Sequence, residues 1–306
     1  MQKIVITSGS AFTDIDTLAS AIGLKELLSQ TGNQTEVVLP GEFNSSITES
    51  IRNWQIQVLK NPQLTNYQTI LVDISNPQYI CSWVDSDSIM ALYDHHFGFE
   101  AYWREKIGDQ AIIKPIGACA TLIWEQYAQK ELTPTISTLS ANLLTTAIIS
   151  NTLNLKSSVT SSRDIQALAQ LKPYTNLPIN WPEKYFTEVE QHIFQDIPTA
   201  IKNDTKVQEI TNLNQTFVIG QIELWNSSGF IRDHQKEIRD VLTSFGNPNW
   251  FMTSPSISQG INYLYTENEE IKVSLSQIIN AKFEGNVGTT PKLWLRKEIL
   301  RELQKL

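Results

Sequence analysis

The first half of the chain alternates short β-branched runs with segments of helical period, and this alternation limits the fold more than any other feature. Four runs are predicted as strands, at residues 3–7, 35–39, 69–74 and 90–93. The third run is almost wholly apolar, which is typical of a strand buried on both faces of a parallel sheet. Strands that alternate with helices predict an α/β domain with a mostly parallel sheet and helices on both faces.

Helical spacing of apolar residues continues beyond these strands. It covers residues 118–127, 136–149 and 163–171. The segment 171–185, LKPYTNLPINWPEKY, then places three prolines within eleven residues, and prolines at this density interrupt regular structure. We expect a short helix over 183–194 to end the first domain.

The rest of the chain predicts a second, smaller domain of mixed α/β type. Longer strand-like runs cover residues 215–225 and 249–257, and one clear helix covers 231–242. We therefore set the first domain at residues 1–190 and the second at residues 195–306.

The composition suits one large or two ordinary domains with buried cores. The chain has 306 residues, of which 41% are hydrophobic and 18% are charged. No apolar run reaches the roughly 18 residues of a membrane span, and the start MQKIVIT shows no secretory leader, so we expect a cytoplasmic protein without a membrane partner. The net charge of −8 argues against a nucleic-acid partner, because such binding needs a basic surface.

The cysteines and two of the four histidines carry no metal-ligand pattern. Cys81 and Cys119 lie far apart in apolar surroundings, so we predict buried, reduced thiols. His192 and His234 have no partner at ligand spacing, and we predict ordinary surface residues there. The other two histidines are adjacent in the sequence.

Three predicted strands are followed directly by acidic or imidazole side chains. Asp14 and Asp16 follow the first strand, Asp73 closes the third, and Asp94, His95 and His96 follow the fourth. Because ligand sites of open α/β sheets lie at the carboxyl ends of the strands, we expect these side chains to lie together. Such a cluster repels itself unless cations fill it, which points to two divalent metal ions. The alternatives are a helix N-cap for a single aspartate and a hydrogen-bonded turn for the histidine pair.

This order of motifs, DxD, a later aspartate and then DHH, resembles the DHH phosphoesterase superfamily. The segments PIGACATLIWEQY, AIISNTLNLKSSVTSSRD and VIGQIEL resemble family II inorganic pyrophosphatases and the related exopolyphosphatases. The resemblance implies a two-domain enzyme. Its first domain would bind two metal ions, Mn²⁺ or Mg²⁺, and its smaller DHH-associated second domain would close over the substrate phosphates.

The same resemblance implies a role for each residue after a strand. Asp14 would bind one metal, Asp16 and His95 the other, Asp73 would bridge both, and His96 would contact the substrate phosphate. Two metals about 3.5–4 Å apart can bind a bridging water, lower its pKa and neutralise phosphate oxygens.

Two residues depart from the family pattern at the metals. Ser10 stands where pyrophosphatases carry a histidine, and Asn151 where they carry an aspartate, and we keep both as candidate metal ligands. Oxygen ligands favour magnesium at the first site, and an amide brings no negative charge, so we expect weaker metal binding. Asp94 would orient the histidines without binding metal itself.

Three cations of the second domain are candidates for binding the outgoing phosphate by the same resemblance. They are Lys206 in NDTK and Arg296 and Lys297 in LWLRKEIL. Pyrophosphatases carry Ser-Arg-Lys-Lys where this chain has Leu295 to Glu298, so half of that run is kept. The alternative for Arg296 and Lys297 is the exposed face of a terminal amphipathic helix.

The sequence thus predicts a metal-dependent hydrolase of phosphoanhydrides, with pyrophosphate or short polyphosphate as the substrate. One alternative is a noncatalytic phosphate-binding protein that has kept the fold, which the departures at Ser10, Asn151 and Glu298 motivate. The other is a nucleotide or oligonucleotide phosphoesterase of the same superfamily. A homodimer is the one protein association that we keep open.

Overall fold

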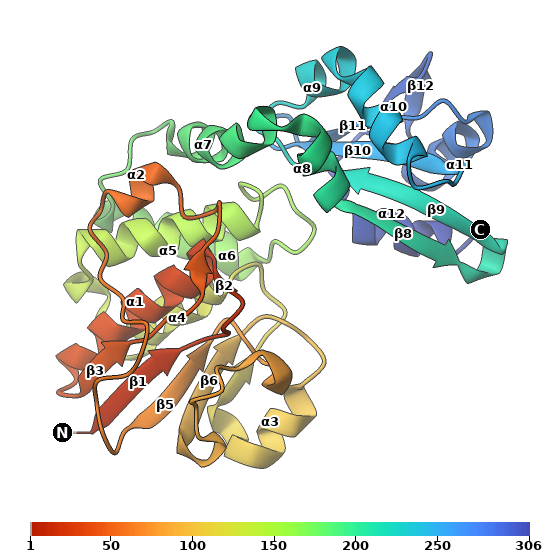
Figure 1. The fold of residues 1–306 in the computed structure, drawn as a ribbon. Coiled ribbons are helices and arrows are strands. Elements are labelled where there is room, and N and C mark those ends of the chain that lie inside the picture. Colours follow the sequence, from red (N-terminus) through yellow and green to blue (C-terminus); the bar gives the residue numbers. More distant parts are fainter. Residues whose placement is uncertain (1) are drawn as a thin grey trace. The chain divides into compact units, whose positions relative to one another are not determined.

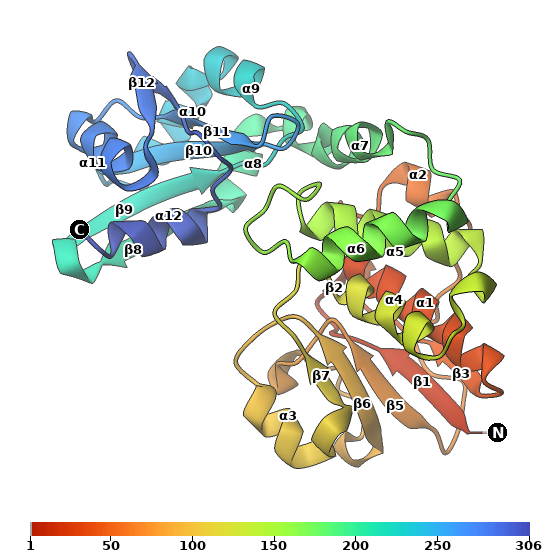
Figure 2. The ribbon, with the colours of Figure 1, turned by 180° about the vertical axis from the view of Figure 1, so that it is seen from behind.

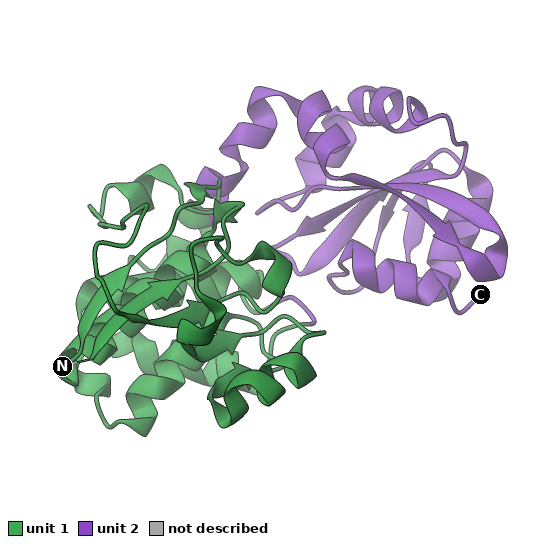
Figure 3. Ribbon diagram, turned by 60° about the horizontal axis from the view of Figure 1, so that its bottom comes forward, with its two compact units in different colours: residues 1–155, 159–185 green, residues 156–158, 186–306 purple. Residues whose placement is uncertain are grey.

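The fold was analysed in a computed structural model that describes residues 2–306. The chain divides into two compact units (Figure 3), residues 1–155 with 159–185 and residues 156–158 with 186–306. The division falls within helix α7 (Trp181–Gln195), between Tyr185 and Phe186. The roles assigned to the two domains from the sequence stay predictions.

The first unit is built on a parallel sheet of five strands in the order β3-β1-β5-β6-β7 (Figures 1 and 2). Its strands are β1 (Lys3–Thr7), β3 (Gln34–Val37), β5 (Gln68–Val72), β6 (Ile89–Asp94) and β7 (Ala111–Ile113). The four predicted strands are confirmed, and the short edge strand β7 was not predicted. Strands β2 (Phe12–Thr13) and β4 (Glu42–Phe43) form a separate pair.

Helices cover both faces of this sheet, as predicted. They are α1 (Ile15–Gln30), α2 (Glu49–Arg52), α3 (Glu100–Ile107), α4 (Cys119–Gln129), α5 (Thr138–Asn151) and α6 (Ser162–Leu171). Helices α1 and α4 lie against the sheet and α5 packs on both, while α3 lies on the opposite side of the sheet (Figures 1 and 2). Trp103 of α3 packs with Leu71 and Leu92 from the strands.

The second unit is a mixed six-stranded sheet in the order β12-β13-β11-β10-β9-β8, in which only β9 and β10 pair in parallel. Its strands are β8 (Thr205–Ile210), β9 (Gln215–Gln221), β10 (Trp250–Ser256), β11 (Ile261–Tyr265), β12 (Lys282–Glu284) and β13 (Val287–Thr289).

Helices line both faces of the second sheet as well. They are α8 (Ile197–Asn203), α9 (Ser228–Asp233), α10 (Gln235–Thr243), α11 (Glu269–Ile279) and α12 (Arg296–Leu303). Side chains alternate along each strand. In β9, Val218 therefore packs with α8, α9 and α10, whereas Ile219 packs with α11 and α12.

The single helix predicted over 231–242 is wrong, because the chain forms two helices there, α9 and α10. His234 separates them with a non-helical backbone (φ −117°, ψ 25°). Its ring packs against Phe230, with ring centroids 5.6 Å apart, and its Nδ1 lies 3.3 Å from Glu237 Oε1. Both contacts are local, within four residues of His234, and the non-helical backbone at this residue interrupts the continuous helical period of the sequence.

The prediction of buried, reduced cysteines is confirmed, since Cys81 and Cys119 are both buried and unbridged. Their thiols donate to the carbonyls of Ser8 and Tyr93, respectively. Among the described residues, no helix combines the length and the apolar character needed to cross a membrane.

Candidate metal centre

Helix α1 begins at the site, and its first residues place two aspartates differently. Asp14 is the N-cap, with an extended backbone, and its Oδ1 accepts a hydrogen bond of 2.9 Å from Thr17 N. The helix N-cap considered for a single aspartate is therefore confirmed for Asp14. Asp16, two residues on, lies in the first turn with no exposed surface.

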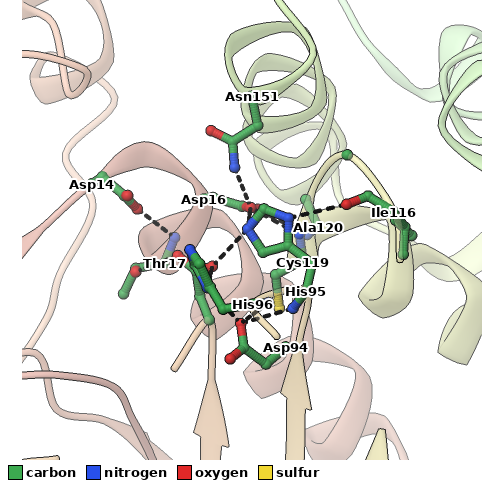
Figure 4. Close-up of polar contacts among 12 residues, drawn as sticks. Asp14, Asp16, Thr17, Asp94, His95, His96, Ile116, Cys119, Ala120 and Asn151 are labelled. Atoms are coloured by element: carbon green, nitrogen blue, oxygen red, sulfur yellow. Dashed lines mark hydrogen bonds and ion pairs between the residues drawn. The ribbon is translucent and has the colours of Figure 1, made fainter. Parts of the chain in front are cut away.

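The buried carboxylate of Asp16 is held by hydrogen-bond donors from two other helices (Figure 4). The backbone amides of Cys119 and Ala120, at the start of α4, each donate to it over 2.8 Å. Asn151, the last residue of α5, donates its Nδ2 to Asp16 Oδ2 over 2.5 Å. The start of a helix favours negative charge, so these amides compensate the burial of this carboxylate in part.

The approach of α4 to Asp16 depends on a glycine and on a second buried aspartate, neither of which was assigned a role from the sequence. Gly117 N donates to Asp164 Oδ2 over 2.9 Å. A Cβ at residue 117 would lie 2.5 Å from Thr152 Cγ2, so only glycine fits there. Asp164 also accepts from Thr121 Oγ1, over 2.7 Å, which fixes the first turn of α4.

Asp73 directly follows the last residue of β5, and its carboxylate lies in the site. The predicted strand over 69–74 stops at Val72, because Asp73 takes a left-handed backbone with a φ of 56°, a conformation that aspartate tolerates. Its Oδ2 accepts a hydrogen bond of 2.8 Å from Thr17 Oγ1. Its Oδ1 is buried and lies 3.3 Å from His95 Nε2, with no other hydrogen-bond partner among the described residues.

His95 presents its Nε2 to these carboxylates (Figure 4). Its Nδ1 lies 3.1 Å from the carbonyl oxygen of Ile116, which can only accept, so Nδ1 carries the proton of that bond. Nε2 lies 3.3 Å from Asp73 Oδ1 and 3.7 Å from Asp16 Oδ2. A backbone carbonyl that fixes one ring nitrogen while the other faces acidic groups is typical of a metal-binding histidine.

Asp94 orients the two histidines. Its Oδ1 accepts from the backbone amides of His95 and His96, over 2.7 and 3.2 Å, and lies 2.8 Å from His96 Nδ1. These bonds match the role expected for Asp94, although they leave its Oδ2 buried and without a partner. The side chain of His96 is 63% exposed and lines a cavity.

The charges of the cluster are poorly balanced. Burial and the charge of Asp73 raise the pKa of Asp14 to about 6 and also raise the pKa of Asp16. Burial would lower the pKa of His95, but the surrounding carboxylates, Asp73 foremost, outweigh it and raise this pKa to about 10. The carboxylates thus draw a positive charge to the position of His95 Nε2.

The residues present suit a divalent cation. Ligand atoms of Asp73, Asp94, His95 and His96 lie within 4.8 Å of one another. The buried Oδ1 of Asp73 is next to His95 Nε2, and carboxylate with imidazole is a donor set that manganese and related ions accept. Asp14 and Asp73 also line one cavity of about 480 Å³, which has no lysine or arginine in its lining.

Two predicted metal ligands, Ser10 and Asn151, make hydrogen bonds through nitrogen atoms rather than through their side-chain oxygens. Ser10 is exposed, and its backbone amide, rather than its hydroxyl, makes its hydrogen bond, to Tyr79 O over 3.3 Å. Asn151 donates its Nδ2 to Asp16 Oδ2 instead of directing its amide oxygen at that carboxylate. Metal binding by Ser10 and Asn151 stays a prediction, as it does for the other candidate ligands.

The cations predicted in the second unit have unequal surroundings. Arg296 begins α12 and its guanidinium donates to Asp204 Oδ1 and to Asp204 O, over 2.7 and 2.6 Å. Lys206 and Lys297 are exposed, and neither has an ion-pair partner among residues 2–306. Glu298 accepts from Leu295 N over 2.7 Å, so this departure from the family run caps the helix.

Comparison with known proteins confirms the resemblance seen in the sequence motifs. No family model matches the chain. Relatives named probable manganese-dependent inorganic pyrophosphatase include one from Lactobacillus johnsonii, 29% identical over 161 residues, which cover 52% of this chain and 50% of the relative. The chain thus matches about half the length of such relatives. A relative of the same name from Oceanobacillus iheyensis is 24% identical over 99% of this chain and 97% of its own.

Solved structures confirm the predicted fold. A protein of Methanococcus jannaschii assigned to the family II inorganic pyrophosphatases matches with a TM-score of 0.60 and 20% identity, over 100% of this chain and 99% of that one. An exopolyphosphatase-related protein from Bacteroides fragilis matches with a TM-score of 0.55 and 14% identity, over 99% and 91%. At these identities the likeness concerns the fold alone.

Proposed function

We propose that the chain hydrolyses phosphoanhydride bonds with divalent metal ions, and that pyrophosphate or short polyphosphate is its substrate. The observation that carries this proposal is the 3.3 Å contact between the buried Oδ1 of Asp73 and His95 Nε2, at the edge of a cavity. An anionic substrate would meet anionic side chains there, so cations must mediate its binding. The manganese-dependent relatives support the same proposal.

Four residues of the first unit would bind the metal ions. Asp73 and His95 would hold metal together with Asp16, and Asp14 would bind a second ion from the N-cap position. Bound ions would neutralise phosphate oxygens and acidify the attacking water. Mn²⁺ is our first choice and Mg²⁺ the second, and the number of ions, two, is part of the proposal.

His96 is suited to contact the substrate. Hydrogen bonding to Asp94 raises the pKa of His96, which favours the imidazolium form. With Nδ1 held by Asp94, Nε2 is left to donate to a phosphate oxygen in the cavity. Because the ring is held by a buried carboxylate, its position does not depend on the substrate.

In the second unit, we propose that Lys206 and Lys297 bind phosphate directly, because both are exposed and have no competing ion pair at contact distance. Arg296 is already bonded to Asp204, so we expect it to contribute mainly by fixing the start of α12. A cytoplasmic location and a homodimer remain predictions.

The test combines metal uptake with catalysis. We expect the purified protein to bind Mn²⁺ in isothermal titration at two sites per chain, and to release phosphate from pyrophosphate or tripolyphosphate only when metal is present. A protein that binds metal but releases no phosphate would favour the noncatalytic alternative, which the contact of Asn151 with Asp16 motivates. Failure of both measurements would overturn the proposal.

A further inference from the structure

The cavity beside the candidate metal centre has several aromatic rings in its lining. Four of its lining residues are Phe12 on β2, Tyr79, Phe97 and Phe99. They come from the segments that follow β1, β5 and β6, which are the same segments that deliver Asp14, Asp73 and His96. The whole lining belongs to the first unit.

Three of these rings have more than half of their surface exposed to solvent. Phe12 is 57%, Tyr79 62% and Phe97 63% exposed. Single exposed apolar residues are ordinary, but several around one concave site indicate a binding surface. Phe99 is different, because it packs partly against the cluster of Leu71 and Trp103.

Pyrophosphate and polyphosphate give these rings nothing to bind. Such ions are charged over their whole surface, and a cavity of about 480 Å³ lies in the range of about 300–1,000 Å³ that accommodates whole organic ligands. Moreover, the cavity lining contains neither lysine nor arginine. The aromatic part of the cavity therefore fits a planar, uncharged group that is attached to the phosphates.

Polar groups among the rings favour a nucleobase over a plain hydrocarbon ring. Asn76 lines the cavity, and its Oδ1 accepts from Gln78 N over 3.0 Å. Its Nδ2 has no partner among the described residues, so this donor is available to a ligand. Ser8 also lines the cavity, as does Ser75, whose hydroxyl already donates to His96 O over 3.3 Å. A base that stacks on aromatic rings and accepts from an amide would meet both features.

We propose that this cavity binds the base of a nucleoside diphosphate whose phosphates lie at the metal centre. The inference rests on the proposed function for its chemical step. Water attacks the terminal phosphorus, and the bond from this phosphorus to the bridging oxygen breaks. The bridging oxygen leaves with the nucleoside monophosphate, and the products are that monophosphate, orthophosphate and a proton.

Binding is tested first without catalysis, with AMP as the probe in buffer that contains Mg²⁺, because a cation must neutralise its phosphate at the carboxylates of the site. Saturation-transfer NMR should show saturation of the base protons of AMP, and Phe97→Ala should weaken AMP binding by between about 5-fold and about 150-fold. Phe97→Trp should retain binding because it keeps an aromatic face. Tyr102→Ala is the matched control, since this ring is 44% exposed but lies outside the cavity, and it should leave AMP binding unchanged.

Catalysis then tests the choice of substrate. The ratio of kcat/KM for ADP to that for pyrophosphate should fall in Phe97→Ala by a factor in the same range, and Asn76→Ala should lower it in the same direction. Base protons without saturation, an unchanged ratio, or phenyl phosphate that binds as tightly as AMP would each overturn the inference. Pyrophosphate hydrolysis without AMP binding would overturn this inference alone, whereas AMP binding without any hydrolysis would overturn the proposed function alone.

Discussion

Two polar clusters of the chain differ in how their charges are balanced. The first cluster is the candidate metal centre, and the second comprises Asp204, Gln221, Glu223 and Arg296. In the first unit, carboxylates surround His95. Asp73 Oδ1 lies 3.3 Å from its Nε2, and the buried Oδ2 of Asp94 has no hydrogen-bond partner. In the second unit, Arg296 is paired with Asp204, and its backbone amide donates to Gln221. Buried polar groups are normally satisfied, so we expect a bound cation to complete the first cluster, whereas the main ion pair of the second cluster is already formed.

This difference separates functional residues from structural ones. A cluster that lacks its counter-charge is expected to change its properties when a cation binds. A cluster that is already neutralised is expected to respond mainly in stability when one partner is removed. Substitutions in the first cluster should therefore change metal binding and activity, whereas substitutions in the second cluster should mainly change stability.

The largest effect is expected at Asp73. Asp73→Asn removes the charge but keeps a residue that tolerates the φ of 56°, so the fold should persist. We expect metal-dependent hydrolysis to fall about 1,000-fold or more, because several kcal/mol of charge stabilisation is lost. Phosphate release and Mn²⁺ titration are the measurements, and Asp109→Asn, at an exposed position, is the control. Wild-type hydrolysis by Asp73→Asn would exclude a metal-bridging role.

In the second unit, neighbouring cations should behave oppositely. Arg296→Gln breaks a pair that is 11% exposed on the arginine and 46% exposed on Asp204, so we expect a loss of about 1–3 kcal/mol in the free energy of unfolding. Lys297→Gln, at an exposed position, should stay within about 0.5 kcal/mol while lowering activity. Urea unfolding and phosphate release on both variants check this. Equal stability losses would show that Lys297 is structural too.

The sequence predicted the parts of the site that follow from periodicity. The ends of β1, β5 and β6 could be located to within two residues from apolar runs, and the parallel order then brings Asp73 and His95 to one edge. Contacts that depend on how distant segments pack could not be predicted. The amides of α4 that reach Asp16 and the pairing of Arg296 with Asp204 are of this kind.

The aromatic cavity shows a different limit. Phe97 directly follows the DHH motif, and this neighbourhood was the one available signal in the sequence. Nothing in the sequence indicates that Phe12 and Tyr79 reach the same cavity, because they lie on separate segments after different strands. Side-chain exposure, which reveals the cavity, depends on the tertiary structure.

A smaller effect is expected at Asn151, where the first cluster is partly compensated by an amide. Asn151→Asp replaces the 2.5 Å hydrogen bond to Asp16 by a contact between two carboxylates. Without metal we expect a loss of about 1–2 kcal/mol in stability. Mn²⁺ should then raise the melting temperature more than in the wild type, because the added charge tightens its binding. Asn151→Leu loses the same hydrogen bond but gains no ligand, so it should show the loss without the larger metal response. Two variants that respond alike to Mn²⁺ would contradict a ligand role at this position.

The smallest effect concerns Glu223, whose charged form is disfavoured within the second cluster. Burial and the nearby Asp204 raise its pKa from an ordinary value near 4.5 to about 7, against the opposing charges of Arg296 and Lys297. Its Oε1 accepts from Gln221 Nε2 over 2.9 Å. Since the folded chain binds this proton more tightly than the unfolded chain, the stabilisation is complete below pH 4.5 and is lost as the pH rises to 7.

Glu223→Gln keeps the shape of the side chain without its charge, so the variant should unfold like the wild type at pH 4.5 and be more stable at pH 8. The pKa shift of Glu223 corresponds to at most roughly 3 kcal/mol in the free energy of unfolding. Because the side chain is partly exposed, we expect Glu223→Gln to gain about 1 kcal/mol at pH 8. Urea unfolding across this pH range measures the difference. Glu209→Gln, on the exposed side of β8, should give a difference that does not vary with pH. If Glu223→Gln also gives a constant difference, Glu223 is already neutralised by Arg296 and Lys297, and the second cluster is fully balanced at every pH tested.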